Sequence, residues 1–266
     1  MLVISCFING CAVSLAYAVK SLSRSGALAA FLVGTLFMFL GGFASWFLLI
    51  MLLVSSSFIE KASVLLRMKS ARRRSSPSDE ENGRSAGQVL ANSLLALTCL
   101  LVFWLSQDRL YYLLMVIAIA GSTADTWASE IGILSQDVPR SLISGAKMPP
   151  GKSGGVTRLG LAASVLGAAF ITSLAVLLTQ PVLVSDWWLL TVLGAVCSLI
   201  DSLLGLSIQE VFLNTRTGQE CEEIPPAAVL TDFRRIKGWP GVNNSMVNVL
   251  SDLLTVLLSW VLLASF

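Results

Sequence analysis

The sequence predicts an all-α fold: a polytopic transmembrane helical bundle of about eight spans, with its N-terminus outside. Hydrophobic residues make up 55% of the chain and charged residues only 13%, with a mean hydropathy of +0.78, whereas soluble domains carry about 25% charged residues. The length of 266 residues suits one bundle, because each span needs about 20 residues. We therefore expect a multi-pass integral membrane protein that forms a single membrane domain over residues 1–266.

Eight apolar segments account for the expected spans. The second and third meet at Gly41 and Gly42, which predicts a tight turn, although the two together also fit one broken or re-entrant element. The first segment ends in a stretch similar to a signal-peptidase site, but no positive charge precedes it, so we expect an uncleaved span. The segments cover residues 2–19, 26–42, 43–62, 88–106, 110–134, 159–180, 187–212 and 242–263.

The distribution of basic residues predicts the orientation. Every Lys and Arg except Arg109 lies in or beside the loops that follow the first, third, fifth and seventh spans. Loops rich in Lys and Arg remain in the cytoplasm, so these loops are cytoplasmic and the N-terminus is outside. The first long loop, residues 67–87, reads as a basic, disordered cytoplasmic linker. We interpret its arginines as a topology determinant, with an anionic-lipid contact as the alternative.

Several kinds of chemistry are excluded by composition. The chain contains no histidine, which removes Ser-His-Asp triads, phosphohistidine chemistry and His-ligated metals. The five cysteines show no C-x-x-C spacing, and four of them lie in or beside apolar runs, where cysteine behaves as a small hydrophobe. We therefore expect no disulfide framework and no zinc or iron–sulfur site, and we expect no nucleic-acid partner.

Three of the expected spans carry polar residues at helical spacing. Close helix packing explains the Gly, Ser and Thr members of these stripes. It does not explain Asp125, Asp201 and Asp252, because an ionisable group inside a membrane is costly and usually functional. The stripes are Ser122, Asp125, Ser129 and Gly132 in the fifth span; Ser198, Asp201, Ser202, Gly205 and Gln209 in the seventh; and Asn244, Asn248, Ser251, Asp252 and Thr255 in the eighth.

The expected topology brings these polar groups to the cytoplasmic half of the bundle. Glu130 follows Asp125 by five residues, which separates the two side chains by about 140° on a regular helix. Glu130 therefore reaches either the shared site or the interface and a basic loop. The predicted polar cavity consists of Ser129, Gln209, Asn243, Asn244, Asn248 and Asp252.

A glycine-rich loop, residues 149–158, precedes the sixth span on the cytoplasmic side. It is not a Walker loop, because Ala146 stands where the G-x-x-x-x-G-K-[ST] pattern requires glycine and no strand precedes it. The ingredients of a phosphate site are nevertheless present in backbone N–H groups, charges and hydroxyls before a helix start. A flexible positive loop is the alternative. The candidate phosphate-binding residues are Gly151, Lys152, Ser153, Gly154, Gly155, Thr157 and Arg158.

Taken in order, these motifs resemble the transmembrane protein 19 family, also called domain of unknown function 92. The similarity covers roughly residues 20–260, and Lys152 stands where the family more often has threonine. The family is also distantly similar to CTP-using polyprenol kinases and cytidylyltransferases. The motifs are Ser25–Ala30, Gln88–Asn92, Ala124–Gly132, Pro139-Arg140, Pro149–Thr157, Ile200–Gly205 and Val242–Asn248.

The resemblance implies an activity, because the family includes the phytyl-phosphate kinase of tocopherol synthesis. We expect a kinase that uses CTP or ATP to phosphorylate an isoprenyl phosphate in the membrane. Asp125 and Asp201 would hold Mg²⁺ together with either Glu130 or Asn244 and Asn248. Glu130 is also a catalytic candidate, and the glycine-rich loop would bind the nucleotide. A transporter or channel for a small polar solute or ion is the second hypothesis. A non-catalytic membrane protein is the third.

Overall fold

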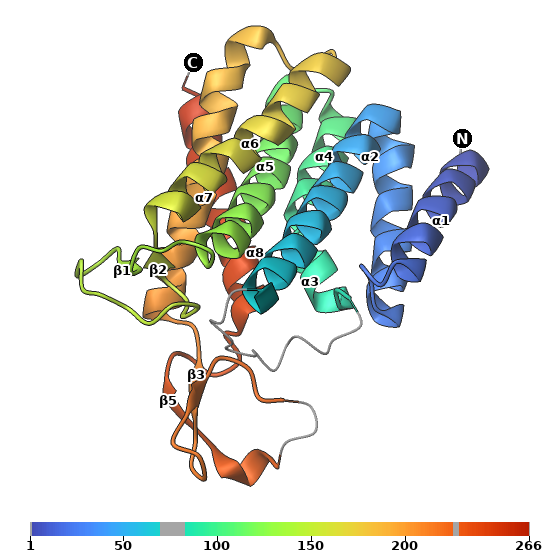
Figure 1. Cartoon of the computed structure of the whole chain (residues 1–266). Helices are drawn as coiled ribbons and strands as arrows, with labels where there is room; N and C mark the ends of the chain where they lie inside the picture. Colours follow the sequence, from blue (N-terminus) through green and yellow to red (C-terminus); the bar gives the residue numbers. More distant parts are fainter. Residues whose placement is uncertain (1, 70–82, 226–228, 266) are drawn as a thin grey trace.

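The computed structural model describes residues 2–69, 83–225 and 229–265. Successive crossings of one bundle run in opposite directions, and both chain ends lie at the same end of it (Figure 1). Five helices are long and apolar enough to cross a membrane, and α1 and α4 are shorter apolar helices. The helices are α1 (Leu2–Ala18), α2 (Arg24–Lys69), α3 (Ala86–Ala91), α4 (Leu94–Ser106), α5 (Arg109–Gly132), α6 (Arg158–Leu178), α7 (Trp187–Ser207) and α8 (Asn244–Leu263).

The long helix α2 is two antiparallel arms joined by a sharp turn (Figure 1). Gly42 has φ 70° and ψ −171°, a conformation that favours glycine because it has no Cβ. The tight turn predicted at Gly41 and Gly42 is therefore confirmed. With the two arms of α2 counted separately, and α3 with α4 as one crossing, the chain passes through the bundle about eight times, as expected.

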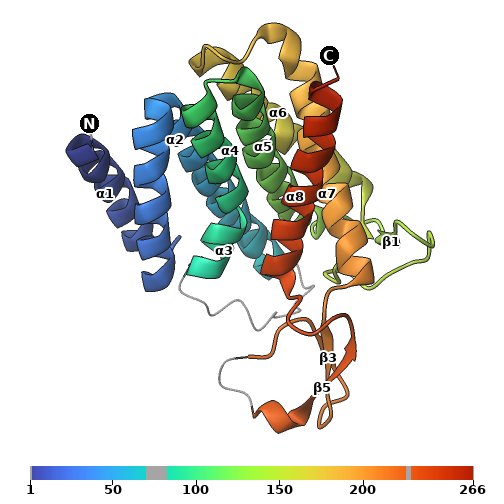
Figure 2. The ribbon, with the colours of Figure 1, turned by 180° about the vertical axis from the view of Figure 1, so that it is seen from behind.

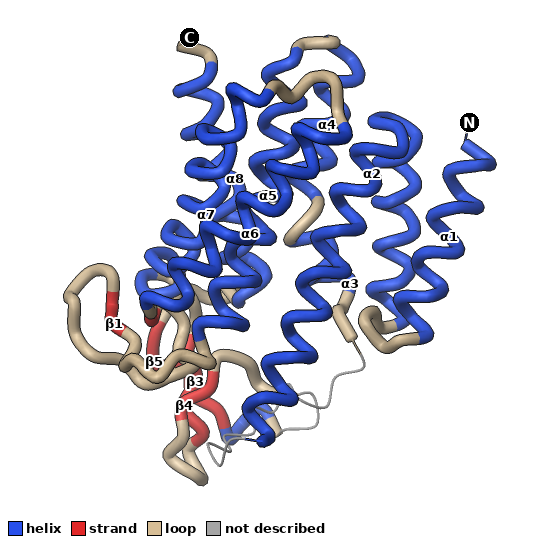
Figure 3. Tube along the Cα trace, turned by 45° about the horizontal axis from the view of Figure 1, so that its top comes forward, coloured by secondary structure: helices blue, strands red, loops and turns tan. Residues whose placement is uncertain are grey.

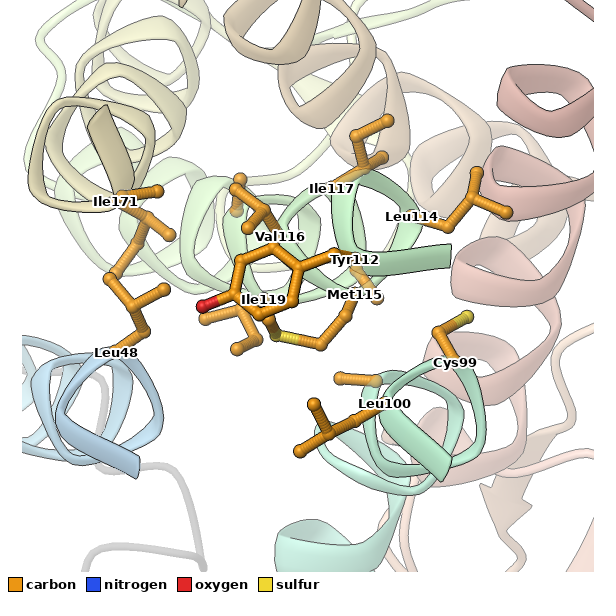
Figure 4. Close-up of a cluster of buried hydrophobic side chains, with 14 of the residues drawn as sticks. Leu48, Cys99, Leu100, Tyr112, Leu114, Met115, Val116, Ile117, Ile119 and Ile171 are labelled. Atoms are coloured by element: carbon orange, nitrogen blue, oxygen red, sulfur yellow. The ribbon is translucent and has the colours of Figure 1, made fainter. Parts of the chain in front are cut away.

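The core of the bundle surrounds α5. Every residue from Tyr112 to Ala124 is buried, and Figure 4 shows part of this apolar cluster between α2, α4 and α5. Small residues allow the neighbouring helices to come close: a Cβ on Gly167 of α6 would lie 3.1 Å from Ala124 Cα, and one on Gly194 of α7 would lie 2.8 Å from Ala120 Cβ. Such close backbone approach is typical of membrane helix packing.

Two expected spans are shorter than predicted. The segment 88–106 is broken at Asn92 and Ser93, where α3 ends and α4 begins. The segment 187–212 stops at Ser207, the end of α7, because the chain turns there into a strand. Gln209 therefore does not lie on a face of α7, which corrects its predicted place in the seventh stripe.

The expected all-α fold did not include two small antiparallel sheets, which lie beside the helix ends opposite the chain termini (Figure 3). One pairs β1 (Arg140–Ser141) with β2 (Gly155–Val156). The other has the order β4-β3-β5 and consists of β3 (Val211–Asn214), β4 (Glu220–Cys221) and β5 (Phe233–Lys237). Short 3₁₀ turns occupy Val184–Asp186 and Leu230–Asp232. The bulk of the predicted linker, residues 70–82, lies outside the described residues.

The described charges follow the predicted asymmetry. At the end that carries both chain termini, Arg109 pairs with Asp186. The remaining described Lys and Arg side chains belong to the opposite end, which carries the two sheets. By the positive-inside rule, the end with the sheets is cytoplasmic.

Candidate functional site

Three carboxylates from three helices meet in the cytoplasmic half of the bundle. Asp125 lies on α5, Asp201 on α7 and Asp252 on α8, and Asp125 is close enough to interact electrostatically with both others. Each is six to eight residues from the cytoplasmic end of its helix, a rise of about 9–12 Å, so the three lie at similar depth. We call these three residues the acid cluster. Figure 2 shows α5, α7 and α8 side by side from behind.

Asp252 is the most enclosed member, with a relative exposure of 3%. Its Oδ2 accepts a hydrogen bond from Ser122 Oγ of α5 at 2.8 Å, and its Oδ1 accepts one from Cys197 Sγ of α7 at 3.2 Å. The three helices come together here because α5 has no side chain at Gly121, where a Cβ would lie 2.8 Å from Cys197 Cβ. Asp252 is thus held by both neighbouring helices.

Asp201 is held from α8. Ser251 Oγ donates to Asp201 Oδ2 at 3.2 Å. The Asn248 amide lies between Asp201 Oδ2 and Asn92 Oδ1, with one of its atoms 3.2 Å from each. Since Asn92 ends α3, the polar network extends from α7 across α8 to the break between α3 and α4.

Asp125 differs from the other two acids. Asp125 and Asp201 are both half-buried, but no donor among the residues that the structure describes makes a hydrogen bond to the Asp125 carboxylate. Since Asp201 and Asp252 have partners and Asp125 has none there, Asp125 keeps open acceptor positions. A carboxylate of this kind is suited to bind a cation or a ligand donor.

Glu130 lies apart from the acid cluster. Its Oε2 accepts a hydrogen bond from Ser63 Oγ at 2.5 Å and lies 3.8 Å from the Arg67 guanidinium, and both partners are on α2. This agrees with its expected 140° separation from Asp125 and with its alternative of contact with a basic segment. We therefore leave Glu130 out of the site.

The glycine-rich loop packs against the last turns of α7, next to the acid cluster. Gly154 has φ +82°, and a Cβ there would lie 2.2 Å from Leu206 Cγ and 2.8 Å from the Ser202 carbonyl oxygen. A Cβ on Gly205 would lie 3.3 Å from Ser153 Cβ. Gly205 follows Asp201 by four residues, so the loop lies about 6 Å of helix rise below Asp201.

The described donors of this loop hold carboxylates. Glu222, which follows β4, accepts from the Ser153 backbone N–H at 2.8 Å, from Ser153 Oγ at 2.5 Å and from Gln209 Nε2 at 3.0 Å. Lys152 Nζ pairs with Glu220 at 2.6 Å. The loop therefore already binds an oxyanion, and that oxyanion belongs to the chain itself. Gln209 is 1% exposed, and its Oε1 has no hydrogen-bond partner among the described residues.

The other predicted site residues have structural or peripheral places. Thr157 caps α6, because its Oγ1 accepts from the Gly160 N–H at 3.0 Å. Asn243 caps α8 in the same way through the Met246 N–H at 3.0 Å. Three residues of the predicted polar cavity are exposed, and their side chains do not take part in the polar network: Ser129, Asn243 and Asn244. In the loop, Gly151 has φ +77° and is exposed, Gly155 packs against Pro139, and Arg158 is exposed.

The acid cluster suits Mg²⁺ only if waters or substrate phosphates supply most of the ion's ligands. In the described ranges, no group of three or more His, Cys, Asp or Glu side chains is arranged to hold a metal. Mg²⁺ is usually bound through one or two carboxylates together with waters and substrate phosphates. The open carboxylate of Asp125, together with Asp201, is suited to this mode of binding. The described residues do not form a site made of protein ligands alone.

The comparison with known proteins covers nearly the whole chain. The family described as "Integral membrane protein DUF92" matches residues 7–256. The chain belongs to this family. Its relatives include "Protein PGR" from Arabidopsis thaliana, 31% identical over 91% of this chain and 89% of that protein. Another is the "Uncharacterized membrane protein MJ0933" from Methanocaldococcus jannaschii, 29% identical over 57% of this chain and 60% of that protein. No solved structure matches.

DUF92 membership confirms the resemblance drawn from the motifs and the multi-pass membrane class. Sequence reasoning missed Glu222 and Cys197 as neighbours of the site. Nothing local marks Glu222, because its contact with Ser153 spans 69 residues. Asn92 belonged to a quoted motif, and its position as an amide inside an apolar run was the signal that a helix break and a polar contact occur there.

Proposed function

We propose that this DUF92 protein is a lipid-phosphate kinase, which transfers a phosphoryl group from a nucleoside triphosphate to an isoprenyl phosphate at the cytoplasmic membrane face. The observation that carries the proposal is the placement of the acid cluster directly above a loop whose Ser153 already binds an oxyanion. Membrane acids are costly and usually functional.

In the reaction, an oxygen of the isoprenyl phosphate attacks the terminal phosphorus of the nucleotide. A new P–O bond forms, the bond to the bridging oxygen breaks, and the products are an isoprenyl diphosphate and a nucleoside diphosphate. Bound Mg²⁺ would neutralise phosphate charge, with Asp125 and Asp201 as its protein ligands. Phosphoryl transfer needs mainly such positioning and charge neutralisation.

The other residues of the site hold this arrangement in place. Ser251 orients the Asp201 carboxylate, and Ser122 with Cys197 fixes the position of the Asp252 carboxyl group. Lys152 and the Ser153 N–H and hydroxyl would bind nucleotide phosphates. For this, they must exchange Glu220 and Glu222 for phosphate oxygens.

The packing of the outer half of the bundle favours an enzyme over a transporter. Between the acid cluster and the outer end of α5, the side chains of Leu114, Val116, Ile117 and Ile119 are buried to 2% exposure or less (Figure 4). A transporter needs a polar path that opens to both sides in turn. An apolar core of this kind supports a site that is reached from one side only.

The test uses purified protein in nanodiscs with geranylgeranyl phosphate, Mg²⁺ and either CTP or ATP, and detects the diphosphate by mass spectrometry. We expect turnover by the wild type, and Asp125→Asn should reduce it at least a hundredfold. Asp137→Asn is the matched control, because Asp137 is an exposed acid at the same end and should be dispensable. No product with either nucleotide, or full activity of Asp125→Asn, would overturn the proposal. Uptake of a solute by sealed vesicles would favour the transporter.

A further inference from the structure

A largely apolar pocket lies between α1, the two arms of α2 and α3, outside the acid cluster. Most of its polar lining residues are gathered at one end of the pocket, in α3 or next to it. They are Arg84, Gln88, Asn92 and Ser93. Asn9 is the one polar lining residue of α1. The apolar lining consists of Ala12, Val13, Leu22, Ala30, Val33, Gly34, Leu49, Ile50, Leu52, Leu53 and Val89. The pocket is therefore apolar along its length and polar at its cytoplasmic end.

The polar side chain of Asn9 does not disturb the apolar character of the wall. Its Nδ2 donates to the Phe31 carbonyl oxygen at 2.9 Å and to Thr35 Oγ1 at 3.2 Å, and its Oδ1 accepts from Trp46 Nε1 at 2.9 Å. Asn9 is fully buried and hydrogen-bonded to α2, so it requires no partner from an occupant. It lies nine residues from the cytoplasmic end of α1, a rise of about 14 Å, which is close to half of the ~30 Å hydrocarbon core.

The polar end of the pocket is connected to the acid cluster through Asn92. Ser122 Oγ donates to Asp252 Oδ2 at 2.8 Å, and the same oxygen lies 3.3 Å from the Asn92 carbonyl oxygen. The Asn92 side chain lies 3.2 Å from the Asn248 amide, which also contacts Asp201. The break between α3 and α4 places Asn92 where one residue lines the pocket and also contacts Ser122 and Asn248, which are partners of the acids.

A positive charge is also present at this end. The Arg84 side chain is only 14% exposed, and its one ion pair within the described ranges is a long contact of 3.5 Å to Glu60 Oε2. Guanidinium groups bind phosphate in a two-pronged geometry. An anionic head group is therefore matched by charge at the polar end, and an apolar chain is matched by the wall above it.

We infer that this pocket holds the hydrocarbon chain of a single-chain lipid phosphate, with the phosphate between Arg84 and Asn92 and directed toward the acid cluster. The inference rests on the proposed function and assigns the acceptor site for that reaction. The chain enters from the cytoplasmic interface and reaches the middle of the bilayer. The nucleotide side of the reaction is formed by the glycine-rich loop and lies on the other side of the acids.

The test is photolabelling with geranylgeranyl phosphate that carries a diazirine in its last isoprene unit, followed by peptide mapping of the full-length protein in nanodiscs. We expect labels on α1 and on both arms of α2, and unlabelled geranylgeranyl phosphate should compete. Val89→Phe should reduce labelling about tenfold, because a ring that excludes about two methylene groups has roughly this effect. Leu90→Phe is the matched control, since Leu90 is 39% exposed and does not line the pocket.

A second pair of variants is included, so that the test does not fail if Val89→Phe does not fold. Leu53→Phe fills the pocket from α2, and its neighbour Val54, 51% exposed, provides the control Val54→Phe. Labels that map outside these helices, or equal labelling of pocket and control variants, would overturn the inference. So would equal labelling by a diazirine phosphatidylcholine that geranylgeranyl phosphate does not displace, because the pocket would then hold an ordinary bilayer lipid.

The two proposals fail in different ways. Asp125→Asn removes a proposed metal ligand and leaves the pocket intact, so its labelling should equal that of the wild type. Pocket labelling without any phosphoryl transfer would refute the kinase and keep the lipid site. Phosphoryl transfer that depends on Asp125, with labels elsewhere, would keep the kinase and refute the lipid site.

Discussion

Glu222→Gln should increase the affinity for nucleotide. In the free protein, the Glu222 carboxylate holds the Ser153 N–H, the Ser153 hydroxyl and the Gln209 amide, which are the donors that phosphate would need. A hydrogen bond to a charged group contributes about 1.5–3 kcal/mol and a neutral one about 0.5–1.5 kcal/mol. Glu222 is partly exposed, so solvent and salt screen its electrostatic interactions.

We therefore expect neutralisation of Glu222 to weaken its hold on the loop by about 1–2 kcal/mol in total. This corresponds to a factor of about 5–30. Because nucleotide must displace Glu222, that free energy is recovered on binding, and the dissociation constant should fall by a comparable factor. The amide also removes the repulsion between the carboxylate and incoming phosphates.

The assay is titration of a fluorescent CTP or ATP analogue into protein in nanodiscs, with Mg²⁺ and without lipid substrate, so that binding is separated from turnover. Glu220→Gln is the comparison, because its contact with Lys152 is a half-exposed ion pair worth at most about 1 kcal/mol. Unchanged or weaker nucleotide binding by Glu222→Gln would refute the reasoning. Glu222 would then be a structural tie between the sheet and the loop, or a contact of the bound nucleotide.

Three further predictions concern stability and reactivity. Gly154→Ala should lower the free energy of unfolding by about 2–4 kcal/mol, because positive φ and overlap with a leucine of α7 both oppose a Cβ; an unchanged melting temperature would contradict this. Asn9→Ala should cost about 1–3 kcal/mol in the same melting assay, because it leaves a buried indole N–H unpaired. Partial burial and then the nearby Glu222 raise the pKa of the Cys221 thiol, so its thiolate fraction at pH 8 is reduced. Glu222→Gln should therefore speed iodoacetamide labelling of Cys221 at pH 8, and a labelling rate equal to that of the wild type would show that burial alone sets this pKa.

Hydropathy and charge were sufficient to predict the bundle, because each span is encoded locally. The fifth segment, predicted as 110–134, is α5 at Arg109–Gly132. The break after Asn92 was missed because no capping signal marks it: the capping box of Ser85 and Gln88 starts α3, and Ser93 before α4 makes no side-chain capping hydrogen bond. The small sheets were missed for a different reason: their strands have two to five residues, and pairing between such strands depends on distant segments.

The same distinction applies to the candidate site. Asp125, Asp201 and Asp252 were found because an acid in an apolar run is unusual by itself. Glu130 was separated from them by helical rotation, and its contact with Ser63 and Arg67 agrees with that geometry. Gln209 was misplaced because the pattern of α7 was continued beyond Ser207, where the backbone is no longer helical. Neither rotation nor spacing relates Glu222 to Ser153, because the contact exists only through folding of the sheet.

Gln209 and Glu222 connect the membrane bundle with the cytoplasmic sheet at the point where the proposed nucleotide site lies. Gln209 is buried between α7 and β3, and its Nε2 holds Glu222 while its Oε1 has no partner among the described side chains and backbone groups. An unpaired buried acceptor is unfavourable unless another group satisfies it. Release of Glu222 would also free the Nε2 group, so both ends of the Gln209 amide would then need partners. A nucleotide with its bound waters can supply an acceptor and a donor together, which makes exchange of Glu222 for nucleotide more favourable than loss of Glu222 alone. If nucleotide binds as proposed, occupation of the loop and the contact between loop and sheet would be coupled through this one amide.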